Sequence, residues 1–273
     1  MQPLIQPFNV LLPMLYGIAL IYYGFYLRNG NEQSGKWAPN ILLSALVVHL
    51  LYFIARSNFQ YFPITNSFDS LSMVAFSIAM IHLIIERTSG EGKTGFFFIS
   101  IAFIFQVSAS MFHVVDIHIH ELLKNPIFGI HVFFTLVGIS ALAISAIYGL
   151  MYWMLAKQIK SHNMGIIYRG MPPLDQLESM GRLSSILGLV SLGLGLIMGH
   201  FYAYRVLGIL FPSDMKIIIN DVAWIFYLLG WAIVKMKNYS GLRLSKLAFW
   251  GFIAYAGAIM AANFISTSFH QFN

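Results

Sequence analysis

The sequence has 273 residues, of which 58% are hydrophobic and only 10% are charged, whereas an ordinary soluble domain carries about 25% charged residues; this composition excludes a soluble globular chain and indicates a polytopic membrane protein. The net charge of +6 comes from basic residues that are scattered between apolar runs, which argues for membrane topology and against a nucleic-acid-binding patch. The chain has no cysteine, which excludes disulfides, thiolate metal ligands and thiol catalysis.

Apolar runs along the chain predict about eight helices. They lie near residues 10–26, 41–55, 71–85, 95–112, 127–156, 183–203, 217–234 and 247–265. Several approach the ~20 residues that cross ~30 Å of hydrocarbon, and backbone within lipid has to satisfy its own hydrogen bonds. We therefore expect an all-α, polytopic membrane helical bundle that forms one integral membrane domain over residues 1–273. The first run is expected to be a retained span, because no basic segment precedes it.

The distribution of basic residues predicts the orientation of the bundle. Twelve of the sixteen Lys and Arg residues fall in alternate loops, and such loops face the cytoplasm. Both termini are then outside. This topology puts six histidines at or near the outer face: His113, His118, His120, His131, His200 and His270.

The segment 199–224 is expected to form an amphipathic shelf at the outer face. It is aromatic and interrupted by Gly208 and Pro212, and aromatic rings favour the depth of the lipid headgroups. At its start, Gly195 and Gly199 have the spacing of small residues that let two helices approach closely. The candidate site is therefore an aromatic shelf flanked by histidines.

His131 and His270 are the candidate metal ligands, because both lie at outer ends of predicted helices. Two neutral imidazoles from separate helices can ligate one haem iron axially, while apolar side chains cover the macrocycle. The alternative is that each histidine caps a helix end or forms a hydrogen bond at the interface. Position alone does not decide between them.

Other polar residues have two interpretations each. Five polar residues within a short segment predict either a second outer-face metal cluster or a solvated loop: His113, Asp116, His118, His120 and Glu121. His200 is a candidate for contact with a propionate, for alternative ligation or for an interfacial hydrogen bond. Asp221 is a carboxylate inside a predicted span, a functional candidate by default, which alternatively reaches interfacial water or pairs with Arg205.

Several stretches resemble the cytochrome c assembly family of the CcsA/CcmC type, including its HemX-like branch. Asn66-Ser-Phe-Asp-Ser is similar to the segment that enters the family's third span, and Pro172-Pro-Leu-Asp-Gln-Leu to the stretch before its sixth. Six residues align with the family's tryptophan-rich haem-binding segment: Gly199, Ala203, Gly208, Asp214, Lys216 and Trp224. His131 and His270 fall on its two external histidines, and the resemblance covers most of the chain.

This resemblance implies a haem-binding membrane protein that acts in haem handling or cytochrome c maturation at the outer face. The implied cofactor is b-type, non-covalent haem, with His131 and His270 as axial ligands and Tyr202, Asp214 and Trp224 as further binding residues. The implied partners are an assembly protein with a periplasmic domain, the apocytochrome c and membrane lipid, and the implied location is a bacterial inner membrane. Whether the chain is itself an enzyme stays open.

The departures from the family pattern support an alternative function. The assembly proteins carry tryptophans at five positions that are here Tyr202, Leu207, Phe211, Ser213 and Ile219. They also carry an intramembrane histidine where this chain has Ala232, although His49 falls near their other one. A haem-responsive regulatory or structural membrane protein fits these differences. A secondary transporter fits less well, since the two halves of the chain show no inverted repeat.

Overall fold

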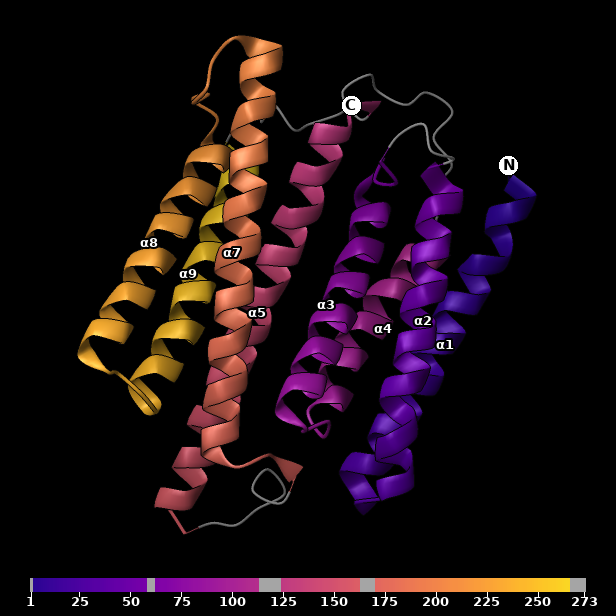
Figure 1. Ribbon diagram of the computed structural model, residues 1–273, viewed down its shortest axis with the longest axis vertical. Helices are drawn as coiled ribbons and strands as arrows, with labels where there is room; N and C mark the ends of the chain where they lie inside the picture. Colours follow the sequence, from indigo (N-terminus) through magenta and orange to yellow (C-terminus); the bar gives the residue numbers. More distant parts are fainter. Residues whose placement is uncertain (1, 58–61, 113–123, 163–169, 266–273) are drawn as a thin grey trace. The chain divides into compact units, whose positions relative to one another are not determined.

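The computed structural model describes residues 2–57, 62–112, 124–162 and 170–265. Within these ranges the chain forms eight helices and no strand, which confirms the predicted all-α fold (Figure 1). The helices are α1 (Gln2–Asn29), α2 (Glu32–Ser57), α3 (Ser67–Ser89), α4 (Gly95–Met111), α5 (Pro126–Lys160), α7 (Leu174–Leu207), α8 (Met215–Lys237) and α9 (Leu242–Ile265).

Seven of these helices are long and apolar enough to cross a membrane. The eighth, α4, has 17 residues and spans about 26 Å at the usual rise per residue, which is near the lower limit for a crossing. The protein is therefore an integral membrane protein built as a helical bundle. The predicted outer position of both termini remains a prediction.

The helices fall into two compact units, which we describe separately. Unit 1 comprises Met1–Gly129 and Met164–Pro172, and unit 2 comprises Ile130–Asn163 and Pro173–Asn273. That the whole chain forms a single domain remains a prediction.

In unit 1, helices α1 to α4 form a closed four-helix arrangement. Helix α1 packs against α2 and α4, and α3 packs against α4 and α2. Two fully buried tyrosines of α1, Tyr16 and Tyr23, point into this core. Because a hydroxyl in a hydrocarbon environment needs a partner, unit 1 is expected to contain buried polar contacts.

The start of α3 is fixed by one such contact. Asn66 caps the helix by accepting from the backbone N–H groups of Phe68 and Asp69, and Asp69 forms a buried ion pair with Arg56 of α2 at 2.9 Å. The Thr65 N–H and hydroxyl also donate to the Asp69 carboxylate. This motif, noted in the sequence for its resemblance to the family, ties α2 to α3.

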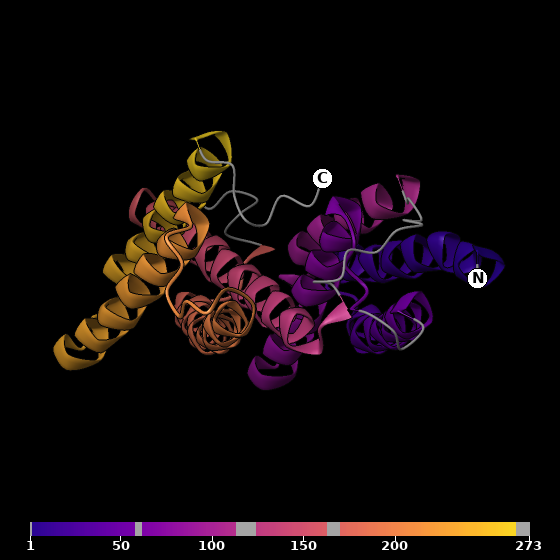
Figure 2. The ribbon, with the colours of Figure 1, turned by 90° about the horizontal axis from the view of Figure 1, so that it is seen from above.

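In unit 2, glycines bring α5 and α7 into backbone contact. A Cβ atom built on Gly138 of α5 would lie 2.5 Å from the backbone nitrogen of Leu192, and one on Gly188 of α7 would lie 2.7 Å from the Leu142 side chain. Helix α8 follows α7 and packs beside it, and α9 packs against α8. Seen from above, α7 is viewed almost along its axis, with α8 tilted beside it (Figure 2).

The backbone contact at Gly138 yields a stability prediction. Gly138→Ala should destabilise the protein by about 1–3 kcal/mol, because the added methyl group has to displace the backbone at Leu192 rather than a flexible side chain. Gly257→Ala in α9 is the matched control, since nothing lies within 4 Å of its built Cβ. Thermal unfolding in mild detergent should show a lower Tm for Gly138→Ala and an unchanged or higher one for Gly257→Ala. Equal Tm values for both variants would contradict the close contact.

Candidate functional site

The predicted shelf lies at one end of unit 2 and is divided among three elements. Residues 199–207 complete α7, residues 208–214 form a turn, and residues 215–224 begin α8. Gly208 ends α7 with a φ of 70°, in the left-handed region that glycine adopts without strain. Asp214 begins α8, because its side chain accepts from the backbone N–H of Lys216. The shelf is therefore the junction of two helices.

At this end the His131 side chain of α5 lies directly on α7. A Cβ atom built on Gly199 would lie 2.6 Å from Nδ1 and 2.7 Å from Cε1 of His131. One turn earlier, a Cβ on Gly195 would lie 2.8 Å from the Thr135 backbone nitrogen. The predicted close approach at Gly195 and Gly199 is present, and its effect is to form a seat for the imidazole ring of His131.

A hydrogen bond fixes the orientation of this ring. His131 Nδ1 lies 2.7 Å from the carbonyl oxygen of Gly195. A carbonyl only accepts, so Nδ1 carries the proton and donates. A neutral imidazole that donates from Nδ1 has its lone pair on Nε2. Metal-ligating histidines in proteins are commonly oriented by such a bond from the other ring nitrogen.

His200 has a different environment, in which both ring nitrogens face acceptors. Nδ1 lies 2.9 Å from the carbonyl oxygen of Leu210 in the turn, and Nε2 lies 3.0 Å from a carboxylate oxygen of Asp221 in α8. The ring thus connects the end of α7 to the turn and to α8. Of the alternatives for His200, these contacts match the hydrogen-bonding role. Asp221 pairs with His200 and not with Arg205, which lies over the Phe201 ring.

The other predicted binding residues are placed at different depths. Tyr202 is buried, with 4% of its surface exposed. Trp224 is half-buried and donates its indole N–H to the carbonyl oxygen of Leu189, above Gly193. Asp214 stays at the helix start. The structure thus brings His131 together with Gly195 and Gly199, while Trp224 packs deeper, against the core of α5 and α7.

The surface of the shelf is apolar. Phe211 in the turn is 67% exposed, and Ile209 beside it is 55% exposed. Such side chains at a helix junction favour contact with lipid or with an apolar ligand over contact with water. The exposed face of the shelf therefore includes large apolar side chains, among them the aromatic ring of Phe211.

Helix α9 returns to the same end of unit 2. The Tyr255 hydroxyl donates to the side-chain carbonyl of Asn220, near the start of α8. The last residue of α9 is Ile265. His270 lies outside the described residues, as do His113, His118 and His120. Among the residues that are described, no group of three or more His, Asp or Glu side chains comes together to hold a metal ion.

In unit 1, a chain of buried hydrogen bonds includes His49. The Tyr16 hydroxyl lies 3.0 Å from Nδ1 of His49, Nε2 of His49 lies 2.9 Å from the Ser72 hydroxyl, and Ser72 donates to Gln106. Because the single Ser72 proton goes to Gln106, Ser72 accepts from Nε2, and Nδ1 accepts from Tyr16. Both nitrogens of this fully buried ring are paired, so His49 is part of the packing of α1 to α4.

A second buried histidine of unit 1 lies beside an acid. His82 and Glu86 are one turn apart on α3, with His82 Nε2 3.4 Å from the carboxylate, and the Tyr23 hydroxyl of α1 donates to the same carboxylate. No pattern in the sequence indicated these partners.

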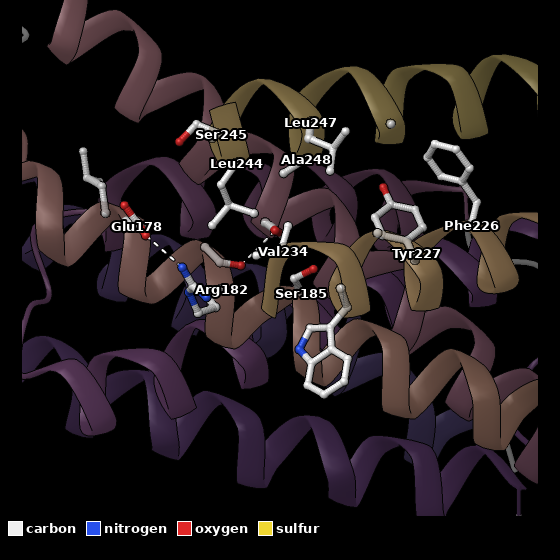
Figure 3. Close-up of a pocket in the computed structure, with 17 residues that line it drawn as sticks. Glu178, Arg182, Ser185, Phe226, Tyr227, Val234, Leu244, Ser245, Leu247 and Ala248 are labelled. Atoms are coloured by element: carbon white, nitrogen blue, oxygen red, sulfur yellow. Dashed lines mark hydrogen bonds and ion pairs between the residues drawn. The ribbon is translucent and has the colours of Figure 1, made fainter. Parts of the chain in front are cut away.

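At its other end, unit 2 contains a cavity of about 70 Å³ between its helices (Figure 3). Glu178 and Arg182 of α7 form an ion pair at its edge, at 2.9 Å. Glu178 also accepts from the backbone N–H of Gly241, in the turn between α8 and α9. These contacts fix the turn to α7 and leave room in the cavity for about two water molecules at ~30 Å³ each.

The fold and the oriented His131 ring define a helical membrane protein with a candidate metal-ligating histidine at one end of unit 2. Comparison with known families is specific: the family described as "Cytochrome C assembly protein" matches residues 64–270. The chain belongs to this family, which confirms the resemblance inferred from the sequence and associates the protein with cytochrome c biogenesis and haem handling.

Relatives of similar length support this assignment. Protein HemX of Brevibacillus brevis is 22% identical over 262 residues, which cover 94% of each chain. Protein HemX of Bacillus subtilis (strain 168) is 21% identical over 274 residues, covering 95% of this chain and 94% of the relative. Cytochrome c biogenesis protein CcsA of Prochlorococcus marinus (strain MIT 9301) is 23% identical over 292 residues, covering 98% and 94%. No solved structure matches the chain.

Proposed function

We propose that the protein binds haem at the outer face of the membrane and acts there in haem handling or cytochrome c maturation. The observation that carries the proposal is the seat of His131: the ring rests on Gly199 and donates from Nδ1 to the Gly195 carbonyl. In this tautomer Nε2 carries the lone pair that would bind the iron. Membership of the cytochrome c assembly family supports haem as the ligand.

His270 is the proposed second axial ligand. Helix α9 ends at Ile265, at the same end of unit 2 as His131, and His270 follows five residues later. Five residues reach at most about 17 Å. A bis-histidine pair would hold the iron in its six-coordinate, low-spin form, which suits retention of haem more than reaction with a small ligand.

The proposed haem is b-type and non-covalent. The chain has no cysteine, and thioether bonds to the haem vinyl groups require cysteine thiols. Apolar side chains would therefore provide the remaining binding energy. The exposed apolar face of the shelf, with Phe211 and Ile209, suits this purpose. Tyr202, Asp214 and Trp224 remain proposed binding residues, of which Tyr202 and Trp224 would act from beneath the shelf.

The proposed partners follow from the same role. A protein that presents haem for attachment needs the apocytochrome c as recipient and an assembly partner with a periplasmic domain to bring it. The relatives named HemX and CcsA are consistent with a bacterial inner membrane as the location. In this scheme the chain would orient haem, while the nucleophilic thiols would belong to the substrate protein.

A second candidate function is that of a haem-responsive regulatory membrane protein. The observation in its favour is His49, whose ring nitrogens are both paired, with Tyr16 and Ser72. At the position where the assembly proteins carry their other intramembrane histidine, this chain has Ala232. A chain without an intramembrane haem site would sense or store haem at one face and deliver none across the bilayer.

Replacement of the axial ligands tests the proposed site. His131→Gly and His270→Gly should each convert a low-spin, six-coordinate absorption spectrum of the purified protein to a five-coordinate one, since each removes one ligand from the iron. His200→Gln is the control, because both nitrogens of His200 are already engaged and its spectrum should stay low-spin. Unchanged spectra in both glycine variants would refute the assignment, and a Soret band that is absent even after haem supplementation would favour a transporter.

The shelf makes a separate prediction about affinity. Large aromatic faces stack on a flat macrocycle, so the positions where the assembly proteins carry tryptophan should limit haem retention here. Restoring Leu207→Trp and Ser213→Trp should raise the haem-to-protein ratio after purification. At ~25 cal/mol per Å², about 100 Å² of added contact corresponds to at most about 2.5 kcal/mol.

Tyr202→Ala should have the opposite effect, since it removes a buried aromatic ring from beneath the shelf. The haem-to-protein ratio of this variant should fall below that of the wild type. If neither the restored tryptophans nor Tyr202→Ala alters retention, the shelf is no haem surface and serves a structural role.

A further inference from the structure

A long apolar groove runs along unit 2 between α8 and α9. Its volume is about 820 Å³, within the ~300–1,000 Å³ range of small-molecule sites. The lining is apolar along most of its length, for example at Val222, Trp250 and Ala254. Arg243 and Lys246 are the only charged residues among the described ones that line it. We propose that this groove binds an anionic phospholipid, with an acyl chain along the apolar wall and the phosphate at Arg243 and Lys246.

The charged lining residues lie at one end of the groove and the apolar ones extend from there along α9, an order that matches the headgroup and acyl chain of a lipid. Both cations lie in the first turns of α9, and the lining extends along α9 to Ala258. From Arg243 to Ala258, fifteen residues further along α9, the helix rises about 22 Å. One leaflet of hydrocarbon is roughly 15 Å thick, half of the bilayer core. The groove is therefore long enough to hold an extended acyl chain below a headgroup.

The basic end of the groove has the character of a membrane interface. Lys246 Nζ lies 5.2 Å from the ring centroid of Trp153, and Arg243 lies 5.7 Å from that of Tyr239. Tryptophan and tyrosine concentrate at headgroup depth. In the described part of the chain, neither cation pairs with a carboxylate, and no acidic side chain lines the groove. Their charge is thus available to a phosphate, and the predicted topology places them on the cytoplasmic side, where anionic lipids attract basic residues.

A buried hydroxyl provides a third contact. Tyr227 lines the groove, and its buried hydroxyl oxygen makes no hydrogen bond to any described residue. It lies 3.7 Å from the Cβ position of Gly251, five residues and about 8 Å beyond Lys246. Buried hydroxyls normally have partners. The ester carbonyls of a phospholipid lie between its phosphate and its acyl chains and would accept from this hydroxyl.

Other occupants fit these features less well. A second copy of the chain across a two-fold axis would bring Arg243 and Lys246 against the same positive charges. Haem has anionic propionates, but among the residues that the structure describes no histidine or methionine lines the groove to ligate its iron. A zwitterionic lipid would leave the two cations only partly compensated. The inference does not depend on the proposed axial ligands His131 and His270, although the apolar end of the groove includes Ile218, Ile219 and Val222 of the shelf.

Native mass spectrometry of the full-length protein in mild detergent tests the proposal, with phosphatidylglycerol and phosphatidylcholine added separately. The wild type should retain one phosphatidylglycerol in preference to phosphatidylcholine. The double variant R243Q/K246Q should lose this preference, a weakening on the order of 20-fold at a factor of about five for each basic residue. K235Q/K237Q is the matched control, because it removes the same charge from the same end without altering the groove lining.

Gly251→Leu provides an independent variant that fills the groove and keeps both cations. It should reduce retention of phosphatidylglycerol while its Tm stays close to the wild-type value, since the Cβ of Gly251 meets only the Tyr227 ring and hydroxyl. Three outcomes would overturn the proposal: equal retention of both lipids by the wild type, equal losses in the two double variants, or a dimer that Gly251→Leu dissociates.

Discussion

The close contact between α5 and α7 is the constraint on which the rest of unit 2 depends. In lipid, helices gain nothing from burying apolar side chains against one another, so small residues and polar contacts decide where they meet. Gly138 and Gly188 bring the two backbones together, and Gly195 and Gly199 continue the contact to the end of the unit. There the His131 ring occupies the space beside Gly199, and the Thr135 hydroxyl occupies the space beside Gly195. The packing that holds the helices together is thus the same packing that orients the candidate ligand.

His49, His131 and His200 differ in their hydrogen-bond partners. His49 accepts from Tyr16 and donates to Ser72, and His200 faces acceptors at both nitrogens, so each connects helices as part of the framework. His131 is oriented from one nitrogen by a backbone carbonyl, an arrangement that leaves the direction of the other nitrogen defined. The hydrogen bonds of His49 and His200 thus join helices within their own units, whereas the bond from His131 to Gly195 defines the tautomer of the proposed ligand.

Much of the fold could be predicted from the sequence, because hydrophobic runs of span length have only one reasonable conformation in lipid. All eight runs are helical, and the glycine spacing at Gly195 and Gly199 correctly indicated a close helix contact. The pairing of His200 with Asp221 could not be predicted, since it depends on how the turn at Gly208 folds α8 back onto α7. The Tyr16 and Ser72 contacts of His49 were also missed, because their sequence separations carry no periodic signal. For His270 the sequence and the family remain the only guides.

The central claim is that unit 2 provides one haem site whose ligation depends on His131. An optical titration of the purified, haem-free wild-type protein with haem, in mild detergent, tests it most directly. The account predicts a Soret band that saturates at one haem per chain with a low-spin spectrum, and a Gly199→Ala variant, whose methyl group would displace the His131 ring, that binds haem more weakly. A linear increase without saturation, or identical titration curves for the two proteins, would contradict it.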